Sequence, residues 1–136
     1  RDLVRSRGLG DVYKRQVVLD VNGWLVTVFN THLSVESEDA NTETLDCLRD
    51  ILRKRLEEHP EGFACCGDFN TLPDKVEEHI PFAAPVQHDL ITYSDRSAID
   101  NILCAGEVRA EDVRVFDTQY DNSSDHHMLL AQIYRA

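Results

Sequence analysis

The 136-residue sequence lacks the features of a membrane protein, a zinc module or a repeat protein. No apolar run approaches the roughly 18 residues that a membrane-spanning helix needs, so stable membrane insertion is not expected. No internal repeat or low-complexity segment is present. The four cysteines include no Cys-x-x-Cys pair, which argues against a zinc site, and their mostly apolar neighbours predict reduced thiols in a cytoplasmic protein. These cysteines are Cys47, Cys65, Cys66 and Cys104.

Positive charge is also scarce. The chain has 14 Lys and Arg residues against 25 Asp and Glu residues, which gives a net charge of −11. Five basic and two acidic residues lie within residues 1–16, so the other 120 residues carry a net charge of −14. Because nucleic-acid phosphates are contacted by Lys and Arg, this acidic body is not expected to hold a long polyanion. A bound metal ion could still supply positive charge locally.

Residues 1–16 show neither helical nor strand periodicity. Positions 5–16 resemble the translated adapter tail that recurs at the ends of metagenomic reading frames, so residues 1–16 are interpreted as a non-native or disordered tail. Residues 17–136 then form the domain, and the natural gene is expected to begin further upstream. A basic arm that contacts nucleic acid or anionic lipid is the alternative.

The first half of the body predicts a β-hairpin followed by a helix. Two β-rich runs, at 17–21 and 24–30, flank Asn22-Gly23, the dipeptide that best tolerates a type I′ turn. Both sets of alternating side chains in the second run are largely apolar, which predicts a strand buried on both faces. From about Ser37 to His59, apolar residues recur with the helical period.

The second half continues the alternation of strands and helices that is typical of α/β proteins. Small and apolar residues at 63–66 predict a buried strand, which Gly67 is expected to end by a sharp turn. One short helix is expected after Pro73. Three further strands are expected at 99–105, 108–116 and 127–134.

Four polar clusters lie at the edges of the apolar runs, and they contain Asp, Asn and His but almost no cation. Any one of them could be an ordinary turn, because Gly, Asp and Asn are favoured in turns. Together they predict one site that binds a hard metal ion and moves protons. The clusters are Asn30-Thr31-His32, Gly67-Asp68-Phe69-Asn70, Ile99-Asp100-Asn101 and Ser124-Asp125-His126-His127.

In this order, over about residues 17–134, the four clusters resemble the C-terminal part of the endonuclease/exonuclease/phosphatase family. This family of metal-dependent phosphohydrolases includes pancreatic deoxyribonuclease, abasic-site endonucleases, neutral sphingomyelinases and inositol-polyphosphate 5-phosphatases. The resemblance implies an α/β fold that is part of a deoxyribonuclease I-like four-layer sandwich, with mixed β-sheets flanked by helices. It also implies Mg²⁺ or Mn²⁺ as cofactor and hydrolysis of a phosphate ester in nucleic acid, a phospholipid headgroup or an inositol phosphate. No protein partner is implied.

The resemblance assigns the attacking water and the metal ion to the first, second and fourth clusters. His32 matches a histidine that contacts the phosphate or the leaving group. Asp68 matches the acid that orients or deprotonates the water, and Asn70 matches the amide that contacts the scissile phosphate. Asp125 matches a metal-site carboxylate, and Asp68 and Asn70 complete the expected metal-binding set.

The resemblance assigns stabilisation of the transition state to a carboxylate–imidazole pair. Asp100 matches the acid that pairs with the last histidine, and His126 matches the histidine that stabilises the pentacoordinate phosphoryl group. Adjacent residues of a strand point to opposite faces, so only one of His126 and His127 is expected to reach the site. We select His126 because it follows Asp125. Asn101 departs from the family, which often has an aromatic residue there.

The family also has an N-terminal half, which contributes an early Asn and, in a Gln-Glu pair, a metal-binding Glu. Nothing in residues 1–16 matches either residue, so the sequence is expected to be a truncated part of the domain. The alternative function is therefore a catalytically incomplete fragment that acts at most as a weak metal-binding or interaction domain. A fold that has these loops but no phosphate chemistry is a third possibility.

Overall fold

The computed structural model of the chain describes residues 13–93, 97–116 and 124–136. Strand β1 begins at Tyr13, so residues 13–16, which the sequence assigned to a tail, belong to the first strand. Their pairing with the last residues of the neighbouring strand continues the register of the hairpin. The rest of the expected tail, and most of the loop expected at 117–124, lie outside the described residues.

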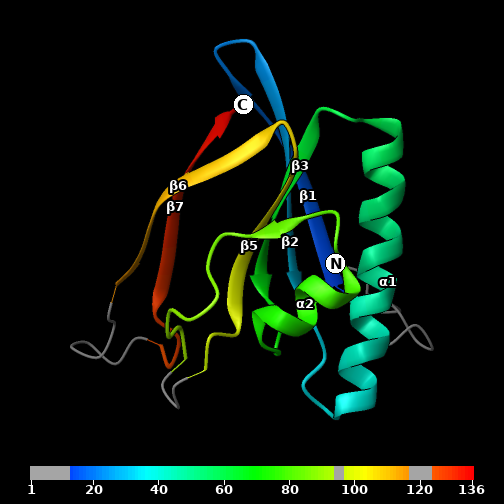
Figure 1. The fold of residues 1–136 in the computed structure, drawn as a ribbon, viewed down its shortest axis with the longest axis vertical. Helices are drawn as coiled ribbons and strands as arrows, with labels where there is room; N and C mark the ends of the chain where they lie inside the picture. Colours follow the sequence, from blue (N-terminus) through cyan, green and yellow to red (C-terminus); the bar gives the residue numbers. More distant parts are fainter. Residues whose placement is uncertain (1–12, 94–96, 117–123) are drawn as a thin grey trace.

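The predicted hairpin is formed by β1 (Tyr13–Val21) and β2 (Trp24–His32), which pair antiparallel around Asn22-Gly23. Both turn residues have positive φ, 52° and 91°, as a type I′ turn requires. The predicted burial on both faces of β2 holds only for residues 26–29, because Leu25 is 59% exposed and Asn30 is exposed as well. Leu25 is exposed because the tip of the hairpin projects past the elements that cover the sheet (Figure 1).

Helix α1 (Glu38–Glu58) confirms the predicted helix to within one residue at each end. The Ser37 hydroxyl caps it by accepting a hydrogen bond from the Ala40 N–H at 3.0 Å. Its apolar stripe is fully buried against the sheet at Leu45, Leu48 and Leu52. In the described part of the chain, no helix is apolar enough over sufficient length to cross a membrane.

The main sheet has five strands in the order β1-β2-β3-β5-β4 and is mixed. Strand β3 (Gly62–Asp68) runs parallel to β2, while β5 (Asp100–Gly106) pairs antiparallel with β3. The two-residue strand β4 (Ala84–Pro85) lies at the edge beside β5. The strand order confirms the mixed α/β fold class predicted from the sequence.

Different layers cover the two faces of this sheet (Figure 1). Helix α1 and the short helix α2 (Pro73–His79) cover one face. On the other face, β6 (Val108–Phe116) and β7 (Met128–Arg135) form a separate antiparallel pair. Strand β6 has the predicted bounds, while β5 and β7 each begin and end one residue later than predicted.

The role predicted for Gly67 needs correction. Strand β3 does not end at this glycine but continues through it to Asp68. A Cβ atom at position 67 would lie 2.0 Å from the carbonyl oxygen of Thr31 on the neighbouring strand β2. Glycine is therefore required here because two backbones approach closely, and this approach extends β3 to the position of Asp68.

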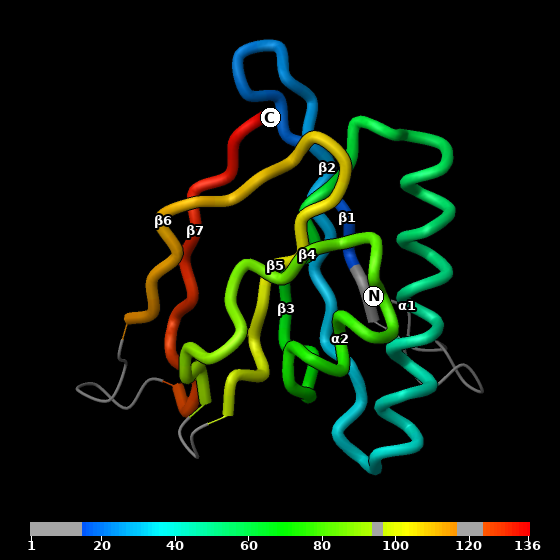
Figure 2. Tube along the Cα trace, viewed as in Figure 1, coloured from blue at the N-terminus to red at the C-terminus, as the bar shows by residue number. Residues whose placement is uncertain are grey.

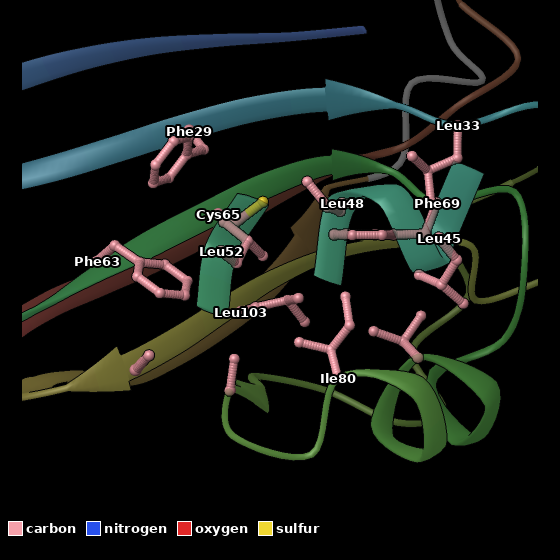
Figure 3. Close-up of a cluster of buried hydrophobic side chains, with 13 residues drawn as sticks. Phe29, Leu33, Leu45, Leu48, Leu52, Phe63, Cys65, Phe69, Ile80 and Leu103 are labelled. Atoms are coloured by element: carbon pink, nitrogen blue, oxygen red, sulfur yellow. The ribbon is translucent and has the colours of Figure 1, made fainter. Parts of the chain in front are cut away.

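The hydrophobic core lies mainly between the sheet and the helices. Figure 3 shows Phe29, Phe63 and Leu103 of the sheet beside the buried leucines of α1. The rings of Phe29 and Phe63 meet edge to face, with centroids 5.6 Å apart. A smaller cluster around Val26 and Val108 joins the other face to β6 and β7, so the central strands are fixed from both sides.

Candidate active site

The register of the main sheet places three of the predicted site residues side by side. His32 is the partner of Asp68 across the parallel strands β2 and β3, and Asp68 is the partner of Asp100 across the antiparallel strands β3 and β5. Strands β2 and β3 end at the edge where β5 begins, and β7 also begins at this end of the molecule (Figure 2). Residues that are far apart in the sequence therefore meet at the end of the main sheet where β2 and β3 end and β5 begins. We call this end of the strands the sheet edge.

His126 reaches this edge from the segment before β7. Its Nδ1 lies 2.7 Å from Oδ2 of Asp100, and its Nε2 lies 3.6 Å from Oδ2 of Asp68. An ionised carboxylate can only accept a hydrogen bond, so Nδ1–H donates to Asp100. The imidazole is thus held by one carboxylate with its other nitrogen directed towards a second.

The surroundings change the proton affinity of His126. Burial by itself lowers the pKa of His126, but the hydrogen bond that its Nδ1–H donates to Asp100 and the negative charges of Asp100, Asp68 and Asp125 outweigh burial and raise this pKa above its usual value. His126 therefore keeps a proton more readily than an exposed histidine does.

Asp68 is also shifted towards its protonated form. Burial raises the pKa of Asp68, and the charge of Asp100 adds to this effect, against the backbone N–H of Asn70 and the two histidines. A carboxylate with a raised pKa is a stronger base than an exposed aspartate. The site therefore places an imidazole that keeps its proton more readily than usual beside a carboxylate that accepts a proton more readily than usual.

A short turn after β3 joins the second cluster to the first. Oδ1 of Asp68 accepts a hydrogen bond from the Asn70 N–H at 2.9 Å, and Asn70 adopts a positive φ of 49°. The Asn70 side-chain amide donates to the Leu33 carbonyl at 2.9 Å, and the Leu33 N–H donates to the Asp68 carbonyl at 3.0 Å. The loops that follow His32 and Asp68 are thus tied together.

The remaining predicted site residues are more open to solvent. Nε2 of His32 lies 3.5 Å from Oδ2 of Asp68, and the His32 side chain is 65% exposed. Asp125 is exposed and acts on His126 through its charge. Both side chains are accessible to a molecule that approaches the sheet edge.

Among the described residues, Asp68, Asp100 and His126 place one possible ligand atom each within 4.8 Å of one another. This group shares only Asp68 with the metal-binding set expected from the sequence. Carboxylate oxygens suit hard divalent cations such as Mg²⁺ and Mn²⁺. A cation beside Asp68 would also offset the repulsion from Asp100, so the donor set fits such an ion.

Sequence reasoning missed a buried amide that supports the site. Asn41 of α1 is 4% exposed, and its Nδ2 donates to the carbonyl of Ser34 at 3.0 Å and to that of Phe69 at 2.9 Å. It therefore holds both loops next to His32 and Asp68. The available signal was a polar residue on the apolar stripe of the helix, one turn before Leu45.

Asn101, which departs from the family pattern, is a second buried amide. It is 3% exposed, accepts hydrogen bonds from the N–H groups of Val86 and Ile102, and donates to the Gln87 carbonyl. These bonds attach Val86 and Gln87, which follow β4, to the start of β5. Asn101 is therefore a structural residue beside Asp100.

No protein-family model and no curated protein sequence matches the chain. Solved structures match its fold. The human nocturnin catalytic domain aligns with a TM-score of 0.74 and 16% identity over 93% of this chain and 54% of that one. An endonuclease/exonuclease/phosphatase protein from Beutenbergia cavernae aligns with a TM-score of 0.73 and 16% identity over 92% and 40%.

A mannosyl-6-phosphatase from Bacteroides thetaiotaomicron aligns with a TM-score of 0.62 and 13% identity over 83% of this chain and 52% of that one. The chain thus spans about half the length of most of these structures. Its helices and strands, and the polar residues at the strand ends, follow one another in the order that was expected from the sequence. The chain therefore has the fold of the endonuclease/exonuclease/phosphatase family, and its extent fits a C-terminal part of that fold.

Proposed function

We propose that this chain carries catalytic residues of a metal-dependent hydrolase that cleaves phosphodiester or phosphomonoester bonds. The observation that carries the proposal is the convergence of His32, Asp68, Asp100 and His126 at one sheet edge. The similar structures add support, because one is named a phosphatase and another contains a bound sulfate, an anion with the tetrahedral shape of phosphate.

In the proposed reaction, a water molecule attacks phosphorus in line with the leaving group. Asp68 acts as the base, because its Oδ2 lies 3.5 Å from Nε2 of His32, whose side chain is 65% exposed and open to a substrate. His126 donates from Nε2 to the negative charge that develops on the phosphoryl oxygens. Asp100 keeps the imidazole protonated and oriented through its 2.7 Å hydrogen bond.

His32 and Asn70 would contact the phosphate or the leaving group. A divalent cation, Mg²⁺ or Mn²⁺, would be held by Asp68 with Asn70 and Asp125, and it would neutralise the phosphate oxygens. Oδ2 of Asp100 already contacts Nδ1 of His126, which leaves Asp68 as the more available carboxylate of the two half-buried aspartates.

The test is hydrolysis of p-nitrophenyl phosphate and bis(p-nitrophenyl) phosphate with Mg²⁺, with Mn²⁺ or with a chelator. We expect Asp68→Asn and His126→Ala each to lower the metal-dependent rate by about 10²–10⁴-fold, the range for loss of an acid or base. If both variants keep the parental rate, the assignment is wrong.

A matched control is available on the helical face of the same chain. Asp46 and His79 form a second carboxylate–imidazole pair, also with a 2.7 Å separation, between α1 and α2. Asp46→Asn and His79→Ala should leave the rate unchanged. A similar loss in these variants would show that the effect at Asp68 and His126 is not specific to the site.

The second candidate is a chain that binds metal weakly and does not turn over substrate. It is favoured by one observation, namely that the group of possible ligand atoms among the described residues includes only Asp68 of the metal-binding set expected from the sequence. Calorimetric titration with Mg²⁺ and Mn²⁺ distinguishes the two. Weak binding without turnover supports the second candidate, while tight binding with turnover contradicts it.

A further inference from the structure

The segment between β4 and β5 contacts both members of the Asp100–His126 pair, although no motif marks it in the sequence. We propose that Thr92 and Tyr93 are positioning residues for this pair: Thr92 holds the two backbones together, and Tyr93 holds the imidazole ring. The inference rests on the proposed function, in which this pair stabilises the phosphoryl group.

The need for such residues follows from the sheet topology. Asp100 begins β5 of the five-stranded sheet, whereas His126 precedes β7 of the separate two-stranded sheet. Among the described strands, β5 and β7 are not paired, so no ladder of hydrogen bonds sets their spacing. A 2.7 Å contact between residues 26 positions apart therefore needs another backbone link.

Thr92 provides this link from a fully buried position. It is 0% exposed, its Oγ1 accepts a hydrogen bond from the Asp100 N–H at 3.0 Å, and its carbonyl accepts one from the His127 N–H at 2.7 Å. The Thr92 N–H and hydroxyl both donate to the Ser97 carbonyl, which fixes the residue itself. One residue thus connects the start of β5 to the neighbour of His126.

Tyr93 acts on the side chain of His126. The two residues form an isolated antiparallel β-bridge, and their ring centroids lie 4.8 Å apart with the planes tilted by 58°. A ring packed at this distance restricts rotation of the imidazole. The restriction matters because a flip of the ring about its Cβ–Cγ bond would place carbon atoms where Nδ1 now faces Asp100 and Nε2 now faces Asp68.

The test is long-range ¹H–¹⁵N NMR of the histidine rings, recorded on the whole chain at one fixed pH. Thr92→Val keeps the shape of the side chain but removes the acceptor for Asp100, and Tyr93→Leu removes the aromatic ring. We expect both to shift the His126 ring signals. Thr92→Ser and Tyr93→Phe should restore the parental positions, because they keep the hydroxyl and the ring.

Matched controls separate positioning from general destabilisation. Thr44 is equally buried, but its hydroxyl bonds within α1 and to Ser34, so Thr44→Val should leave the His126 signals in place. The ring signals of His79 report that each variant is folded. If Thr92→Val does not fold, Tyr93→Leu at its half-buried position decides alone.

The proposal is overturned if folded Thr92→Val and Tyr93→Leu both leave the His126 ring signals unchanged. This readout needs no substrate, so it is independent of the proposed hydrolysis. Shifted His126 signals in a chain without any hydrolytic activity would support the positioning role and remove the proposed function. In an active preparation, the same two variants should lower kcat by about tenfold or more with little change in KM.

Discussion

At the scale of single residues, the site is centred on the carboxylate of Asp68. Its Oδ2 lies 3.5 Å from His32 and 3.6 Å from His126, and its Oδ1 accepts a hydrogen bond from the Asn70 N–H. Burial and the nearby charge of Asp100 make its ionised form less favourable in the folded chain. Ionisable groups whose pKa is shifted in this way by burial and by a nearby charge are concentrated at functional sites.

Replacing Asp68 by Asn should therefore stabilise the chain while it removes activity. The pKa of Asp68 is raised on folding, so its contribution to stability falls as pH rises through the folded-state value. An amide of the same shape removes this unfavourable charge at neutral pH. We expect Tm, measured by circular dichroism, to rise by a few degrees. The exposed Asp89→Asn should change little, and a clear fall in Tm for Asp68→Asn would contradict the account.

At His126, in contrast to Asp68, the charged form of the side chain should stabilise the folded chain. Its pKa is raised on folding by Asp100 and the neighbouring carboxylates, despite the opposing effect of burial. Its contribution is therefore fully present below the unfolded value of about 6.5 and is lost as pH rises through the folded value. In urea titrations, His126→Asn should cost more stability at about pH 5.5 than at about pH 9. An equal cost at both pH values would refute this assignment.

At the scale of the elements, the site depends on how closely β2 and β3 approach each other. The approach occurs at Gly67, directly before Asp68, and it brings Asp68 into register with His32. Asn41 then links α1 to the loops that follow both strands. The positions of the side chains therefore follow from backbone contacts rather than from the loops alone.

A methyl group at Gly67 should separate the two strands. Its Cβ would lie 2.0 Å from the Thr31 carbonyl oxygen, so Gly67→Ala should lower the free energy of unfolding by about 3 kcal/mol or more. Gly23 also has a positive φ but has no atom within 4 Å of a Cβ, and Gly23→Ala should cost about 1 kcal/mol. Chemical denaturation measures both. Equal costs would show that the close approach is not the reason for glycine at position 67.

Local patterns predicted the elements well. The turn at Asn22-Gly23 and the helical period of the apolar residues in α1 are signals between near neighbours in the sequence, and the structure confirms the elements they predicted. The structure also brings His126 of the fourth polar cluster into contact with Asp100 of the third.

What the sequence did not reveal depends on contacts between distant segments. The need for Gly67 arises from Thr31, and the support given by Thr92 arises from Asp100 and His127. The start of β1 at Tyr13 depends on pairing with β2, because residues 13–16 have no alternating pattern of their own. No local propensity encodes contacts of this kind.

At the scale of the whole molecule, apolar side chains remain exposed on two sides. One group lies on the hairpin of β1 and β2, and the other lies on β6 and β7. Exposed apolar patches of this kind promote association with other surfaces. The side chains, each at least 39% exposed, are Val17, Val18, Leu19, Val21, Leu25, Phe116, Met128, Leu130 and Tyr134.

The stability of the chain should therefore depend strongly on one buried leucine and hardly at all on one exposed leucine. Leu48 is 0% exposed and Leu25 is 59% exposed. Leu48→Ala should cost about 2–5 kcal/mol of stability, whereas Leu25→Lys should cost less than about 0.5 kcal/mol. Leu25→Lys should also reduce the binding of a hydrophobic dye. Comparable destabilisation by both changes would mean that the hairpin is packed in solution.

We propose above that one divalent cation binds where β2 and β3 end and where β5 and β7 begin. A titration of the chain with Mn²⁺, followed by paramagnetic broadening of the backbone amide signals, tests this site directly. We expect the signals of His32, Asp68, Asp100 and His126 to broaden first, those of Gly23 and Gly106 to stay sharp, and Asp68→Asn to remove the selectivity. Broadening that is spread evenly over the acidic surface, or centred away from Asp68, would show that the cation does not bind at this site.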